Sequence, residues 1–209
     1  MGSSPVLKGP KGVDASSPVI KNRPVKAKIE VLDKDSNLLN INLSRLALER
    51  ENGGCVELLN PKSKEYQVMR SSLLPGLLKF IKKNAYHRPP IRIFEVGDVF
   101  NINGDSDTGA INCRRIAGAI AGTTDGLSDL IAFINQVLTK CKVNTRFVRK
   151  EKSVFLEKRG GRILCDDDVI IGNFGVVHPR ILKFYGIGMA CSIFEIDLDN
   201  LLKIMVSKR

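Results

Sequence analysis

The most informative feature of this 209-residue chain is a helix-like segment at residues 71–84 that runs into a strand-like segment at residues 88–100. In the first segment, large apolar residues recur three and four positions apart, which is the spacing of one face of an α-helix. They are Leu74, Leu77, Leu78 and Ile81. Ser72 is suited to cap this helix, and Pro75 is tolerated in its first turn because the missing N–H would have no partner there. The sequence therefore predicts an amphipathic helix.

The following segment has the alternation of a β-strand, but apolar residues fall on both of its faces. Ile91 and Ile93 point one way, and Phe94 and Val96 point the other. A strand that is apolar on both faces is typical of a sheet covered on both sides. We therefore expect this strand to lie inside a covered sheet.

The rest of the chain mixes strands with a few helices. An amphipathic helix is predicted at 127–140, and a short helix at 179–185 ends at Gly186. Residues 199–205 are expected to form at most a last helical turn. Short strands are predicted at 114–122, 145–150, 153–158, 161–166, 169–177 and 192–198. This order favours an α+β fold with a largely antiparallel sheet over a regular βαβ repeat.

The chain divides into a leader and one module. Residues 1–27 are rich in Gly, Pro, Ser and Lys, so we expect a flexible leader or a segment foreign to the fold. Residues 28–209 are expected to form a single module. No apolar run approaches the ~20 residues that span a bilayer, and no secretory signal is recognisable. We therefore expect a cytoplasmic protein with no membrane partner.

The residues do not form the usual patterns of a catalytic or metal site. The five cysteines lie far apart without a CxxC pair, and neither histidine is close to one, which argues against a zinc site. Nucleotide-binding glycine motifs and the GxSxG motif are missing. We expect His178 to cap a helix and His87 to be solvated. The sequence predicts no catalytic residue, no metal ligand and no cofactor in this chain.

The net charge of +11 allows an acidic partner such as nucleic acid. The densest basic stretch is residues 140–162, with phenylalanines interleaved. The candidates for RNA contact are Arg146, Arg149, Lys150, Lys152 and Arg159. Phosphate contact is one interpretation. The alternative is a solvated face of two edge strands, where lysine also discourages unwanted pairing.

The apolar residues of the predicted helix at 71–84 nearly encircle it. Such a helix is buried in a core or at a subunit interface, because its exposure would favour aggregation. The periodicity leaves both alternatives open.

Two long blocks carry a family resemblance. NPKSKEYQVMRSSLLPGLLKFIKKN, followed by IRIFEVGDVF, is the first, and VIIGNFGVVHPRILKFYGI, followed by SIFEIDL, is the second. In their order and spacing they resemble the beta subunit of phenylalanyl-tRNA synthetase, over roughly residues 55–200. The bacterial form continues into a ferredoxin-like anticodon-binding domain, whereas this sequence stops after the last strand, so the eukaryotic or archaeal type is expected. A fragment, a split gene product and a degenerate copy all stay open.

The resemblance implies a fold and a set of roles. The fold would be a class II synthetase-like antiparallel sheet flanked by helices, without catalytic activity of its own. The alpha subunit of a heterotetramer would bind ATP and magnesium, and the assembly would attach phenylalanine to tRNA(Phe). This chain would hold the alpha subunit and would reach tRNA(Phe) only through the complex. The expected contact residues are Leu73, Leu74, Leu77, Leu78 and Ile81.

A catalytic class II enzyme carries an Arg-x-Glu strand pattern and a late glycine-rich arginine motif. Here Arg92 and Glu95 are separated by one residue too many, which places them on opposite faces of a strand. The last strand and its flank contain no counterpart of the second motif. These departures predict a silent module. The alternative function is a stand-alone basic RNA-binding module that uses residues 140–162.

Overall fold

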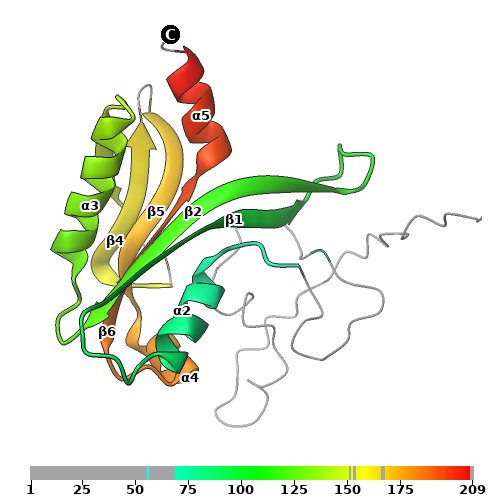
Figure 1. Cartoon of the computed structure of the whole chain (residues 1–209). Coiled ribbons are helices and arrows are strands. Elements are labelled where there is room, and N and C mark those ends of the chain that lie inside the picture. Colours follow the sequence, from blue (N-terminus) through cyan, green and yellow to red (C-terminus); the bar gives the residue numbers. More distant parts are fainter. Residues whose placement is uncertain (1–55, 57–68, 151, 153, 166–167, 208–209) are drawn as a thin grey trace, which may run out of the picture.

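The computed structural model describes residues 56, 69–150, 152, 154–165 and 168–207. Six strands form one antiparallel sheet in the order β1-β2-β6-β5-β4-β3 (Figure 1). The strands are β1 (Ile91–Ile102), β2 (Ala110–Gly122), β3 (Thr145–Arg149), β4 (Phe155–Cys165), β5 (Val169–Val177) and β6 (Ala190–Asp197). The helices are α2 (Leu74–Lys83), α3 (Leu127–Lys140), α4 (Pro179–Tyr185) and α5 (Leu198–Ser207). The predicted α+β class with an antiparallel sheet is confirmed. The predicted leader at 1–27 and the start of the module at 28 lie outside the described residues.

Helices cover both faces of the sheet, and each face has its own hydrophobic cluster. On one face, side chains of α2 and α4 pack against β2 and β6. On the other face, side chains of α3 and α5 pack against β4, β5 and β6. In Figure 1, α3 stands on one side of the strands, whereas α2 and α4 lie together at one end of the sheet. The two clusters share the central strand β6, so its burial couples the two layers.

The predicted helix at 71–84 forms α2 and has Pro75 in its first turn. The capping prediction needs a correction, because the N-cap residue is Leu73 and makes no side-chain cap bond. Ser72 lies one position earlier, where its Oγ accepts a hydrogen bond from the Leu74 N–H at 3.2 Å. At α4 the cap is as predicted, since His178 Nδ1 accepts from the Arg180 N–H at 3.1 Å.

The expectation that β1 lies inside a covered sheet is wrong. Among the described strands β1 lies at the edge of the sheet, and Phe94 and Val96 on one of its faces are 71% and 50% exposed. The opposite face is the one that packs, since Ile91 and Val99 are buried. Alternating apolar residues predict that a segment forms a strand. They do not predict the position of that strand in the sheet, which depends on contacts with residues distant in the sequence. β1 therefore presents an apolar strip to its surroundings.

Two boundaries also differ from the prediction. The segments predicted as separate strands at 153–158 and 161–166 form one strand, β4, with an irregular register between Phe155 and Gly160. Lys158 has a positive φ of 59° within the irregularity, and Gly161 lies so close to the Val148 carbonyl that a Cβ would collide with it. The chain thus bends within β4 and continues in the same direction, instead of forming a turn between two strands. The single turn expected near residue 199 is a ten-residue helix, α5.

None of the helices in the described part of the chain is long and apolar enough to cross a membrane.

The buried Cys191 thiol predicts that stability falls in alkaline solution. Burial raises the pKa of Cys191 from 9.0 to about 12. Between these values the unfolded state loses the thiol proton and the folded state keeps it, so rising pH favours unfolding. We expect the free energy of unfolding to fall by about 1 kcal/mol between pH 9 and pH 10 from this group. Urea unfolding at both values, with Cys191→Ala, measures this difference.

Burial also raises the pKa of Tyr185, which acts in the same direction and persists in the Cys191→Ala variant. The comparison is therefore between slopes, and the wild type should lose more stability per pH unit than Cys191→Ala, which keeps only the Tyr185 contribution. Equal slopes in the wild type and in Cys191→Ala would contradict the assignment.

Candidate functional site

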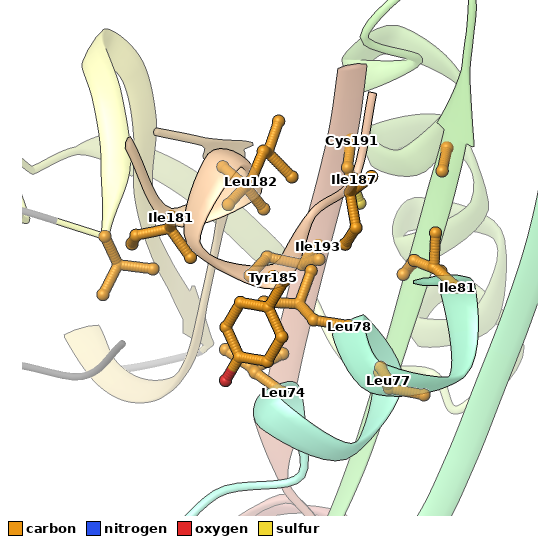
Figure 2. Close-up of a cluster of buried hydrophobic side chains, with 14 of the residues drawn as sticks. Leu74, Leu77, Leu78, Ile81, Ile181, Leu182, Tyr185, Ile187, Cys191 and Ile193 are labelled. Atoms are coloured by element: carbon orange, nitrogen blue, oxygen red, sulfur yellow. The ribbon is translucent and has the colours of Figure 1, made fainter. Parts of the chain in front are cut away.

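The residues expected at a subunit interface lie in the core of this chain. All five are at most 4% exposed, and they belong to the cluster that joins α2 to α4 and β6. They are Leu73, Leu74, Leu77, Leu78 and Ile81. Figure 2 shows the side chains of Leu74 and Leu78 beside Tyr185 and Ile193. Burial of each such side chain contributes about 1.5–3 kcal/mol.

Of the two alternatives that the periodicity left open, the structure shows the core position for these five side chains. A subunit contact made by α2 stays a prediction. Such a contact would use the exposed side of the helix, where Phe80 is 51% exposed beside Lys83.

The start of α2 is tied to the middle of the sheet by the buried carboxylate of Glu195. Glu195 is 7% exposed and accepts hydrogen bonds from the Ser72 hydroxyl at 3.0 Å and from the Leu73 N–H at 2.7 Å. Arg115 on β2 donates to the same carboxylate at 3.2 Å and to the Ser71 carbonyl at 3.4 Å. These hydrogen bonds compensate the buried carboxylate of Glu195 and position the start of α2. The sequence reasoning missed this group, because Ser72 and Glu195 lie 123 residues apart in the chain.

A small polar pocket adjoins Glu195 on β5, β6 and α5, with a volume of about 160 Å³. Arg115 and Asn173 line it, together with Asp197 and Asn200. Arg115 Nε and Asn173 Oδ1 are buried without a hydrogen-bond partner. Pockets that bind cofactors and drug-sized ligands typically have about 300–1,000 Å³. This pocket is too small for a nucleotide.

A larger hollow of about 600 Å³ lies between β1 and α3. Its walls are mostly apolar, and Phe94, Phe133 and Phe194 form part of them. The cation at its rim, Arg92, forms an ion pair with Asp129 on α3 at 3.2 Å. The described residues that line the hollow therefore include no group of free cations that could hold phosphates.

Arg92 and Glu95 lie on opposite faces of β1, as their spacing predicts. Arg92 reaches α3. Glu95 lies on the α2 side, where it accepts from Arg70 at 2.6 Å. Arg70 also donates to the Asp98 carbonyl at 2.8 Å. Arg70 and Glu95 thus form an ion pair near the start of α2.

The basic candidates on β3 and β4 are not equivalent. Arg146 forms an ion pair with Asp168, and Arg159 forms one with Asp125. Arg149 and Lys150 are exposed at the other end of β3, which is an edge strand. Lys152 is half-buried. The structure thus does not bring the five residues into one set of unpaired cations, and their RNA contact stays a prediction.

One further ion pair was not predicted. Arg114 on β2 donates to both carboxylate oxygens of Asp98 on β1, at 2.6 and 2.9 Å. These bonds hold the pKa of Asp98 below its ordinary value of 3.8. Asp98 and Arg114 are directly paired in the β1–β2 register, so a correct hairpin alignment of the sequence would have found them.

Metal-binding chemistry has no support in the described residues, since no three of their His, Cys, Asp or Glu side chains are grouped for a metal ion. Four of the cysteines form no disulfide within the described part of the chain: Cys113, Cys141, Cys165 and Cys191.

The family comparison agrees with this architecture. Residues 40–198 match the family model described as the phenylalanyl tRNA synthetase beta chain CLM domain. A probable phenylalanine–tRNA ligase beta subunit of Encephalitozoon cuniculi is 33% identical over 184 residues, which cover 88% of this chain and 33% of that protein. The phenylalanine–tRNA ligase beta subunit of Saccharolobus islandicus is 33% identical over 154 residues, 74% of this chain and 28% of that protein. The chain thus spans about a third of the length of these relatives.

Solved structures show the same fold class at low sequence identity. Two structures of pyrrolysyl-tRNA synthetase from Desulfitobacterium hafniense superpose with TM-scores of 0.56 and 0.59 at 16% and 18% identity. They cover 68% and 73% of this chain, and 51% and 54% of theirs. The fold is therefore that of the class II synthetases. By the match over most of its length, the chain belongs to the family of phenylalanyl-tRNA synthetase beta chain CLM domains.

Proposed function

We propose that this chain is a non-catalytic module of a phenylalanine–tRNA ligase beta subunit. It holds the alpha subunit within an assembly that attaches phenylalanine to tRNA(Phe) with ATP. ATP and magnesium bind to the alpha subunit, and this chain binds no cofactor. The assembly acts in the cytoplasm, and tRNA(Phe) reaches this chain through the complex. The family membership supports the assembly, and the site geometry supports the silent role.

The observation that supports a non-catalytic role is that two arginines of the sheet, Arg92 and Arg115, are each paired with a carboxylate. Adenylate formation requires cations placed where negative charge develops on the phosphates. Arg115 is bound to Glu195 and Arg92 to Asp129, and the polar pocket beside Arg115 has only about 160 Å³. Each arginine thus already has a carboxylate partner with which a phosphate would have to compete. Pyrophosphate–ATP exchange is therefore expected from the complex and not from this chain alone, and exchange by the isolated chain would contradict the silent role.

The surface proposed to contact the alpha subunit is the exposed side of α2. Its buried side already fills the core, so a partner can only add contacts outside it. Phe80 is the large apolar side chain on that exposed side. Aromatic side chains are enriched among the residues that contribute most to protein interfaces.

The expected result of Phe80→Asp is the loss of co-elution with a phenylalanine–tRNA ligase alpha subunit, because a charge replaces an apolar contact at the interface. Size-exclusion chromatography of the co-expressed chains measures this. The matched control is Leu202→Asp, since Leu202 is 55% exposed on α5. Leu77→Asp is unsuitable, because Leu77 is buried and its replacement would unfold the chain. Co-elution that survives Phe80→Asp would refute this surface, and a wild-type chain that fails to co-elute would refute the scaffold role.

A stand-alone RNA-binding module is the second candidate. The observation in its favour is the exposure of Arg149 and Lys150 at the end of an edge strand. A titration with tRNA that shows a steep salt dependence, and loses it in Arg149→Glu/Lys150→Glu, would support this role. A flat salt response would exclude it.

A further inference from the structure

One end of the molecule carries positive charge with no carboxylate nearby in sequence. Residues 71–94 contain no Asp or Glu, and neither do residues 169–194. These segments include α2, α4 and the connection into β1. Their cations that are exposed and form no ion pair with any described carboxylate are Lys82, Lys83, Arg88, Arg180 and Lys183. Elsewhere on the described surface, several exposed arginines face a carboxylate.

Tertiary contacts bring the two segments together. Lys82 Nζ donates a hydrogen bond to the Gly186 carbonyl at 2.7 Å, just beyond the end of α4. The Gly186 N–H in turn donates to the Lys183 carbonyl at 3.0 Å. In Figure 1 the end of α2 and the whole of α4 lie at the same end of the sheet. The charges of both helices therefore add to one surface.

An exposed aromatic pair follows directly after α2. Tyr86 is 80% exposed and packs against the ring of His87, with ring centroids 4.3 Å apart and planes tilted by 34°. The turn that carries them is held by hydrogen bonds from the His87 N–H to the Asn84 carbonyl at 3.0 Å, and from Asn84 Nδ2 to the Phe80 carbonyl at 2.9 Å. Because His87 contacts Tyr86 from one side, much of the tyrosine ring stays open to a further planar group.

An open aromatic ring among unpaired cations is the combination that recognises single-stranded nucleic acid. The cations neutralise phosphates, and the ring stacks on a base without regard to sequence. An acidic peptide would use the charges but has no general need of the ring. RNA bases stack on aromatic side chains where the strand is unpaired.

We propose that the surface formed by Lys82, Lys83, Tyr86, His87, Arg88 and Lys183 binds single-stranded RNA, with a base stacked on Tyr86. This surface lies at the α2–α4 end of the sheet and does not include the basic residues of β3. It goes beyond the proposed scaffold role and is tested without the alpha subunit. Lys83 lies beside Phe80 on α2, so the two proposed surfaces adjoin, but RNA binding by the chain alone and co-elution with the alpha subunit are separate measurements.

The test is fluorescence anisotropy of the full 209-residue chain with a labelled twelve-residue uridine RNA. We expect binding whose logarithmic salt dependence has a slope of about −2 to −3, as for three or four neutralised phosphates on a single strand. Tyr86→Ala should weaken binding about tenfold through the lost stacking, whereas Tyr86→Phe should bind like the wild type. Lys83→Glu/Arg88→Glu should weaken it by tenfold or more at low salt. Lys82 is left unchanged in these variants because it also bonds to Gly186.

The matched control for charge is Lys140→Glu/Lys203→Glu, which changes the net charge equally at exposed positions of α3 and α5. It should bind the RNA within about twofold of the wild type. Circular dichroism of each variant establishes that it is folded. The proposal is overturned if the wild type does not bind, if Tyr86→Ala binds as tightly as the wild type, or if the control loses affinity equally. Polyglutamate that competes as well as the RNA would show an acidic-peptide site instead.

Discussion

Replacing Leu78 by alanine is expected to lower the free energy of unfolding of the isolated chain by about 2–5 kcal/mol. Leu78 is 1% exposed and lies in the cluster between α2, α4 and β6. The substitution removes buried methyl groups and leaves a cavity that closely packed neighbours cannot fill completely. Urea unfolding followed by circular dichroism measures the loss.

The control is Lys83→Ala on the same helix, because Lys83 is exposed. A surface substitution of this kind usually changes stability by less than about 0.5 kcal/mol. The comparison separates the two interpretations of the leucine-rich face. A side chain that serves only a subunit contact would leave the isolated chain as stable as before. An unchanged midpoint for Leu78→Ala would therefore contradict the core position.

The second large effect is expected at Glu195. Glu195→Ala should destabilise the chain by about 3–5 kcal/mol, because it leaves the partly buried Arg115 guanidinium without its carboxylate. It also removes the acceptor of the Leu73 N–H, which positions the start of α2. Equilibrium urea unfolding measures the loss. Glu195→Gln keeps an acceptor and should lose less.

The control for Glu195→Ala is a substitution in an exposed arginine–carboxylate pair. Asp98→Ala removes the partner of Arg114, but both side chains are well exposed to solvent, so a much smaller loss is expected. The double variant Glu195→Ala/Arg115→Leu tests the mechanism, since removing the orphaned charge should restore part of the stability. If Glu195→Ala costs no more than Asp98→Ala, the carboxylate does not hold α2 in place.

Local sequence patterns were sufficient to predict α2, α3, α4 and most strands, but not the full length of α5. The predicted segments at 127–140 and 179–185 coincide with α3 and α4, because an apolar stripe every three to four residues suits only a helix that packs on one side. The glycine after the short helix is Gly186, and its φ of 67° is the left-handed conformation that ends helices. These features depend on neighbours in the sequence.

Two of the errors, the position of β1 and the extent of β4, share one cause, because both depend on residues distant in the sequence. β1 looked like a covered strand, but its edge position results from the sheet order and leaves Phe94 exposed. The two short strands predicted after residue 152 join into β4, because the chain bends at Lys158 instead of turning back. A pattern of residue types carries no information about either event.

The sequence by itself determined the family, the α+β class, the helix periods and the opposite orientation of Arg92 and Glu95, because all of these follow from the order and spacing of residues. Only the tertiary structure decided that the leucines of α2 are core residues. It also decided that Glu195 joins Ser72 and Arg115, and that the cations of α2 and α4 share one surface with Tyr86. Burial, ion pairing and shared surfaces are set by distances between atoms, and groups more than 100 residues apart in the chain meet only when it folds.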